Sequence, residues 1–198
     1  MNHLRVFIAI DLPKPIQDSI EQQTARLRQS LGNGLIRWVP TNNMHLTLKF
    51  IGNIAASHLD FIKQMLTQTA DSHQPFDLQI GGIGSFPNSK RARVLWVGIH
   101  APAGLASLQK NIETGAARLG YEKEARPFSP HLTLGRVRQN ASPDDLQKVR
   151  SALEGMQIGR IGTACVDSVH LYQSDLHPEG SVYTKLFSAP FKKEMNLR

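Results

Sequence analysis

The tetrapeptide His-Leu-Thr-Leu stands at residues 45–48 and again at residues 131–134. Because alternate residues of a β-strand face opposite sides, each copy directs its histidine and threonine to one side and its two leucines to the other. We predict that the leucines anchor both strands in a core, while the two imidazoles and two hydroxyls face a common cleft. One β-prone stretch with a histidine indicates only a strand, but two identical copies in matching contexts indicate a shared chemical role.

The segments around the two copies alternate between strand and helix patterns. Short apolar runs predict strands at residues 4–10, 36–39, 44–51, 76–83, 94–99, 131–137, 165–172 and 182–187. Apolar residues at helical spacing predict helices at residues 15–31, 57–74, 102–119 and 142–154. Strand pairs between helices favour an α+β fold with antiparallel sheets. Gly81-Gly82-Ile83-Gly84 lacks the Lys-Ser/Thr pair of a phosphate-binding loop, so we expect a turn or bulge there.

Length and composition limit the class of protein. The 198 residues suffice for one domain over residues 1–198, built as two small lobes. No run approaches the ~20 apolar residues of a membrane span, and Arg5 and Asp11 interrupt the first apolar stretch, which makes it a poor signal peptide. The single cysteine, Cys165, excludes a disulfide framework and a Cys-rich metal site within the chain. We therefore expect a cytoplasmic protein, with residues 192–198 as a frayed tail.

The charge balance is basic. Lysine and arginine number 23 and acidic residues 16, which gives a formal net charge of +7. A basic balance favours polyanionic partners. The basic residues are spread along the chain, with small groups at Lys90-Arg91, Arg93 and Arg136.

The two motifs carry groups suited to phosphoryl chemistry without a metal. Histidine titrates near neutrality, so one imidazole can donate a proton while the other accepts one. Threonine hydroxyls can hydrogen-bond phosphate oxygens. The alternative is a zinc ion held by His45, His131 and a third ligand, but there is no His-x-x-x-His pattern and no acidic pair near either motif. Ser129 lacks the flanking glycines of a nucleophile elbow. We expect no metal and no cofactor.

The sequence resembles the LigT-like two-histidine (2H) phosphoesterase superfamily, whose hallmark is a pair of His-x-Thr/Ser-x motifs. It is most similar to the bacterial branch of RNA 2′,3′-cyclic phosphodiesterases, first named 2′-5′ RNA ligases. The residues that carry the resemblance span most of the chain: Arg5-Val6-Phe7-Ile8-Ala9-Ile10, Arg37-Trp38-Val39, His45-Leu46-Thr47-Leu48-Lys49-Phe50-Ile51-Gly52, Phe86-Pro87, Val94-Leu95-Trp96-Val97-Gly98 and Phe128-Ser129-Pro130-His131-Leu132-Thr133-Leu134-Gly135-Arg136.

The resemblance implies a bilobal α+β fold, with two pseudo-symmetric antiparallel lobes and outer helices around a central cleft that holds both motifs. It implies that an RNA 2′,3′-cyclic phosphate is opened to a 2′-phosphate, with weak ligation as the reverse reaction. By the family pattern, His45 is the proton donor and His131 the proton acceptor. Thr47 and Thr133 would bind the phosphoryl oxygens, and Arg136 would neutralise phosphate charge.

The remaining expectations concern the substrate. Phe7 and Trp38 are candidates to stack a base, or else belong to the core, and Arg91 and Arg93 are candidates to follow the RNA backbone or else lie on a solvated loop. The expected partner is an RNA with a 2′,3′-cyclic phosphate end, tRNA fragments included, bound by a monomer with no protein or membrane partner. Two alternatives stay open: a phosphodiesterase for another 2′-linked or small cyclic nucleotide, and a non-catalytic module that binds RNA ends.

Overall fold

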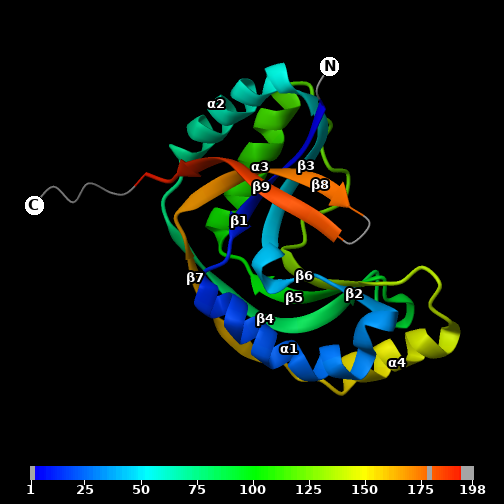
Figure 1. The fold of residues 1–198 in the computed structure, drawn as a ribbon. Coiled ribbons are helices and arrows are strands. Elements are labelled where there is room, and N and C mark those ends of the chain that lie inside the picture. The colour runs from blue at the N-terminus through cyan, green and yellow to red at the C-terminus, as the bar shows by residue number, and fades with distance from the viewer. Residues whose placement is uncertain (1–2, 178–179, 193–198) are drawn as a thin grey trace, which may run out of the picture.

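Two antiparallel sheets form the frame of the molecule (Figure 1). The computed structural model describes residues 3–177 and 180–192. One sheet has four strands in the order β3 (His45–Ala55), β1 (His3–Asp11), β8 (Ser168–His177) and β9 (Gly180–Pro190). The other has five strands in the order β2 (Ile36–Trp38), β6 (His131–Val137), β5 (Val94–His100), β4 (Phe76–Phe86) and β7 (Arg160–Val166). The α+β class predicted from the sequence is therefore confirmed.

Each sheet is covered by its own pair of helices. In Figure 1, α1 (Lys14–Leu35) and α4 (Pro143–Glu154) lie beneath the five-stranded sheet, where α1 contacts β2, β7 and α4. The helices α2 (Leu59–Ala70) and α3 (Ala103–Arg118) pack together against the four-stranded sheet, through β3, β8 and β9. The short 3₁₀ turns η1 (Thr41–Asn43), η2 (Ala56–His58) and η3 (Ser89–Arg91) complete the connections.

Local chemistry sets the ends of the helices as the sequence predicts. Ser142 caps α4 by accepting a hydrogen bond from the backbone of Asp145, whose side chain in turn accepts from the backbone of Ser142. In α1, Gly32 adopts a φ of 64°, which an L side chain rarely takes up, and this interrupts the helix three residues before Leu35.

The leucines of both motifs lie in the core. Leu46 and Leu48 on β3, and Leu132 and Leu134 on β6, are at most 3% exposed, whereas the histidines and threonines between them are partly exposed. The predicted alternation is thus confirmed in both strands. One cluster of buried apolar residues runs through both sheets and all four helices.

One predicted strand is wrong. The segment 165–172 is not continuous: β7 ends at Val166, β8 begins at Ser168, and the two strands belong to different sheets. The sequence did not predict the first half of β7. This strand lies at the edge of its sheet, and only Ala164 and Val166, near its end, are buried, so no apolar run marks where it begins. The glycine-rich stretch in β4 is confirmed as a bulge, since the register shifts there and Gly82 has a φ of +75°.

The chain passes repeatedly between the two layers. Strand β1 belongs to the four-stranded sheet, yet the next helix, α1, packs on the five-stranded sheet. The two layers are therefore built from interleaved parts of the chain, and the single domain over residues 1–198 stays a prediction. Of the predicted frayed tail, residues 193–198 lie outside the described residues, whereas the backbone N–H of Lys192 donates to the carbonyl of His73 at 3.1 Å. No helix within the described ranges is long and apolar enough to cross a membrane.

Candidate active site

Residues from both motifs line one cavity. The cavity has a volume of about 690 Å³ and takes its walls from both sheets, with β3 and β6 in contact beside it. Six of the predicted site residues line it: Phe7, Trp38, His45, Thr47, Thr133 and Arg136. His131 is partly exposed at the start of β6 but is not among the lining residues, and neither are Arg91 and Arg93.

Each motif histidine makes the same kind of hydrogen bond to the backbone. Nδ1 of His45 lies 3.0 Å from the carbonyl oxygen of Asn43, and Nδ1 of His131 lies 2.7 Å from that of Ser129. Because a carbonyl can only accept, Nδ1 carries the proton in both rings. Nε2 is therefore the nitrogen with which each ring can take up or release a proton. In each case the bond runs to the residue two positions earlier, which gives the two rings matching supports.

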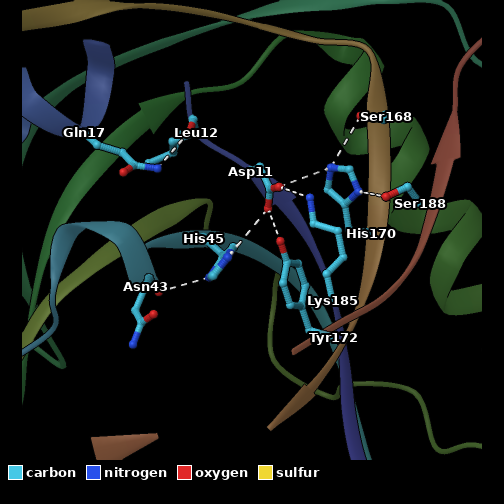
Figure 2. Close-up of polar contacts among 10 residues, drawn as sticks. All are labelled: Asp11, Leu12, Gln17, Asn43, His45, Ser168, His170, Tyr172, Lys185 and Ser188. Carbon is cyan, nitrogen blue, oxygen red and sulfur yellow. Dashed lines mark hydrogen bonds and ion pairs between the residues drawn. The ribbon is translucent and has the colours of Figure 1, made fainter. Parts of the chain in front are cut away.

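Asp11 lies at the centre of a polar cluster beside His45 (Figure 2). Its carboxylate accepts hydrogen bonds from the hydroxyl of Tyr172 and the ammonium of Lys185, both at 2.5 Å. Nε2 of His45 lies 3.6 Å from one carboxylate oxygen, and Nε2 of His170 lies 3.5 Å from the other. Asp11 and His45 are directly opposite each other on β1 and β3, so strand pairing itself brings them together.

The cluster holds Asp11 ionised. Burial alone would raise the pKa of Asp11, but the hydrogen bonds from Lys185 and Tyr172, together with the charges of His170 and Lys185, lower it on balance. Burial and the bond to Asp11 raise the pKa of Tyr172, which therefore stays protonated as a donor. A carboxylate so stabilised is a fixed negative charge beside His45.

Opposite charges act on the two motif histidines. Burial lowers the pKa of His45, and the Asp11 carboxylate offsets part of that effect, while Lys185 adds to it. Burial also lowers the pKa of His131, and here the nearby charge is the Arg136 guanidinium, which lowers the pKa further. Burial thus lowers both pKa values, while the Asp11 carboxylate acts toward a protonated His45 and the Arg136 guanidinium toward a neutral His131.

Hydroxyls and guanidiniums supply donors for an anion. The Thr47 and Thr133 hydroxyls make no hydrogen bond with any other group of the described residues, so both are available to a ligand. Arg136 is exposed on β6, and its cross-strand partner on β2 is Arg37, which also lines the cavity. Sequence reasoning quoted Arg37 for the family resemblance but gave it no role.

The two candidate stacking residues, Phe7 and Trp38, differ in how far their rings are exposed. Phe7 is only 3% exposed, because its ring stacks on Tyr172 at 5.4 Å and meets Tyr183 edge-on at 5.0 Å. It belongs to the wall of the cavity rather than to a free platform. Trp38 stays partly exposed, with the Arg28 guanidinium over its ring at 4.9 Å. Among the aromatic residues that line the cavity, Phe50 is the most exposed, at 66%.

The basic loop does not reach the cavity. Arg91 is the last residue of η3 and Arg93 follows shortly after it, and both are exposed. The η3 turn packs against α4. Their backbones hold the loop: the N–H of Arg91 donates to Asn88, and that of Arg93 to the carbonyl of Phe86 at 2.7 Å. The alternative of a solvated loop fits these two residues.

The possible metal ligands of the described residues do not cluster as a metal site requires. Within residues 3–177 and 180–192, no three histidine, cysteine, aspartate or glutamate side chains are grouped so as to hold a metal ion.

Comparisons with known proteins agree with this geometry. A family model described as the 2′-5′ RNA ligase superfamily matches residues 16–177. A protein of Methanothermobacter thermautotrophicus named RNA 2′,3′-cyclic phosphodiesterase is 31% identical over 183 residues, 92% of this chain and 96% of the relative. A protein of Thermotoga maritima with the same name is 30% identical over 192 residues, 96% of each chain.

Solved structures are similar over nearly the whole chain. Escherichia coli LigT complexed with 3′-AMP has a TM-score of 0.74 at 27% identity, covering 97% of this chain and 100% of LigT. TT0787 of Thermus thermophilus has a TM-score of 0.77 at 26% identity, covering 96% and 100%. With the family model matching most of its length and both motifs at one cavity, the chain belongs to the 2′-5′ RNA ligase superfamily.

Proposed function

We propose that the protein hydrolyses RNA 2′,3′-cyclic phosphate ends to 2′-phosphomonoesters. The observation that carries the proposal is the paired support of the two histidines, each fixed through Nδ1 by a backbone carbonyl, with residues of both motifs at one cavity. Relatives named RNA 2′,3′-cyclic phosphodiesterase cover most of the chain and support the substrate class.

The proposed reaction needs one base and one acid. Nε2 of His131 accepts a proton from water as the water oxygen attacks phosphorus. The bond from phosphorus to the 3′-oxygen breaks, and the 3′-oxygen takes a proton from Nε2 of His45. The products are a 2′-phosphate and a 3′-hydroxyl. In the reverse direction, the same groups would join a cyclic end to a 5′-hydroxyl. The high concentration of water favours hydrolysis over this ligation.

The neighbouring charges support this division of labour. An acid has to begin protonated, and Asp11 raises the pKa of His45 toward that state. A base has to begin neutral, and Arg136 lowers the pKa of His131 toward that state. The electrostatic asymmetry therefore agrees with the roles that the family pattern implies.

Charge that develops on the phosphoryl oxygens needs donors that are already in place. Thr47 and Thr133 contribute free hydroxyls from the two motif strands, and Arg136 contributes a guanidinium. Loss of one such donor typically costs about 2.7–4 kcal/mol of transition-state stabilisation. A single chain supplies all of these groups, so we propose that the enzyme acts as a monomer. Its one cysteine, Cys165, is free and exposed, which is compatible with the reducing cytoplasm that we propose as its compartment.

The direct test is an assay on a short RNA that ends in a 2′,3′-cyclic phosphate, with EDTA present. We expect a 2′-phosphate, identified by its resistance to a 3′-specific phosphatase, and a rate about 10²–10⁴-fold lower with the His45→Ala or His131→Ala variant. Tight RNA-end binding without turnover would favour the binding module. Turnover confined to small cyclic nucleotides or to 2′-5′-linked RNA would favour the other alternative.

A further inference from the structure

A second, smaller cavity adjoins the first. It has a volume of about 310 Å³ and shares six lining residues with the larger cavity: Phe7, Arg37, Phe50, Arg136, Ser181 and Tyr183. Arg5 on β1 lines only the smaller cavity. A ligand anchored in the larger cavity can thus extend directly into the smaller one.

Three arginines line this second cavity, and no carboxylate of the described residues lines it to balance their charge. Arg37 and Arg136 come from neighbouring strands of the five-stranded sheet, and Arg5 comes from the opposite sheet. All three are exposed, and none forms an ion pair with an acidic side chain of the described residues. No aspartate or glutamate of the described residues lines either cavity. Such a group of like charges favours an anion that accepts several N–H donors, as a phosphate does.

An exposed aromatic ring stands between the two cavities. Phe50 lines both of them and is 66% exposed. Its orientation depends on a bulge in β3: Lys49 pairs with Ile8 and Thr47 with Ala9, which leaves Leu48 as an extra residue. The extra residue reverses the alternation, so Phe50 rather than Lys49 follows Thr47 toward the cavities. An exposed aromatic ring beside guanidiniums is typical of sites that stack single-stranded bases.

The chemistry of the substrate fixes what can enter this site, given the proposed function. A cyclic phosphate occupies the 2′- and 3′-oxygens of the last nucleotide, so the chain continues only through the 5′-oxygen. We propose that the second cavity binds the nucleotide that precedes the cyclic end, with its bridging phosphodiester on Arg5 and Arg37 and its base on Phe50. The site therefore selects polynucleotide ends over nucleoside cyclic phosphates.

The test removes one charge from the substrate and its proposed partner from the protein. Two dinucleotides with a 2′,3′-cyclic end are compared, one with the natural phosphodiester and one with an uncharged methylphosphonate at the bridge. The wild type should lose at least about tenfold in kcat/KM on the methylphosphonate, because a hydrogen-bonded charge contact is lost. The Arg5→Gln variant should lose activity on the natural dinucleotide and distinguish much less between the two substrates.

A matched variant controls for the general loss of positive charge. Arg26→Gln removes an exposed guanidinium from α1, outside both cavities, and should keep the wild-type ratio. Equal rates of the wild type on the two dinucleotides would overturn the proposed subsite. It would also be overturned if the Arg5→Gln variant kept the wild-type ratio of kcat/KM between the two dinucleotides. Failure of the wild type to hydrolyse either dinucleotide would instead refute the proposed function.

Discussion

At the residue scale, the two motif histidines differ in their neighbours and not in their support. Both rings are held by a carbonyl two residues earlier. The carboxylate of Asp11 raises the pKa of His45, however, whereas the guanidinium of Arg136 lowers the pKa of His131. His45 also packs against Tyr172, with ring centroids 4.5 Å apart, whereas His131 meets Phe86 edge-on at 4.8 Å. Identical tetrapeptides thus give two groups with opposite electrostatic bias.

This difference predicts unequal rescue of the two alanine variants. A cyclic phosphodiester analogue whose leaving group needs no proton should restore much of the activity of His45→Ala, because that variant lacks only the acid. It should restore little in His131→Ala, where water still lacks a base. Each variant should lose about 10²–10⁴-fold on ordinary RNA. Measured rates on both substrates decide the roles: equal rescue would contradict the assignment, and rescue of His131→Ala alone would reverse it.

Burial predicts an acidic pH maximum. His45 has to be protonated, so activity falls as pH rises through its pKa, and His131 has to be neutral, so activity falls as pH drops through its pKa. Burial lowers both pKa values below the ordinary 6.5. The bell-shaped profile of kcat/KM should therefore have its maximum below about pH 6.5, with limbs that belong to the pair. A maximum above pH 7 would show that burial does not set the pKa values of these two histidines.

The Asp11 cluster predicts opposite pH shifts from two substitutions. Asp11→Asn removes the negative charge that raises the pKa of His45, so the alkaline limb should move to lower pH. Lys185→Met removes a positive charge that lowers the same pKa, so the limb should move to higher pH. His170, Tyr172 and Tyr183 also surround His45 and are unchanged in both variants. Shifts in one direction for both variants would indicate disturbed packing instead of charge.

At the element scale, strand β3 shows what the sequence can predict and where it stops. Alternation over four residues predicts the buried leucines and the partly exposed His45 and Thr47 on the opposite side, because it is a local property. The bulge at Leu48 is set by pairing with β1, so the exposed Phe50 and buried Lys49 could not be predicted. Asp11, Tyr172 and Lys185 escaped prediction for the same reason, since only the order of strands in the sheet brings them to His45.

The buried side chain of Lys49 predicts a large contribution to stability. Its ammonium donates to the carboxylate of Glu113 and the carbonyl of Glu122, both at 2.8 Å, and so ties β3 to α3. Lys49→Met leaves Glu113 without its charge partner and should reduce the free energy of unfolding by about 3 kcal/mol. Chemical denaturation measures this loss, and replacing Glu113 by Leu as well should recover part of it.

An exposed ion pair provides the control for that variant. Arg150→Met breaks the pair with Glu154 on α4, which should change the free energy of unfolding by about 0.5 kcal/mol or less. Similar losses in Lys49→Met and Arg150→Met would mean that burial of the β3–α3 pair adds nothing.

At the scale of the whole molecule, two observations favour an anionic ligand. The net charge is +7, and no acidic side chain of the described residues lines either cavity. The positive field should attract RNA, and each contacted phosphate releases counterions. Arg37 and Arg136 bring part of this charge to both cavities, beside the contact between the two motif strands.

The charge distribution predicts a salt dependence that grows with substrate length. A plot of log kcat/KM against log salt concentration should have a slope of about −0.7 for each phosphate contacted on a single strand. A cyclic mononucleotide should therefore give about −0.7 and a dinucleotide about −1.4, with both assayed at one pH. Equal slopes for the two substrates would mean that only the cyclic phosphate is bound through charge.

The Asp11 cluster also has a consequence for the order in which the protein is made. Asp11 takes its hydrogen bonds from Tyr172, 161 residues later, and from Lys185, 174 residues later. A ribosome delivers the N-terminal strand first, and contacts between distant residues form slowly. His45 therefore gains its charged surroundings only when translation has passed β9, so a nascent or truncated chain carries both motifs but lacks the environment that prepares the first of them.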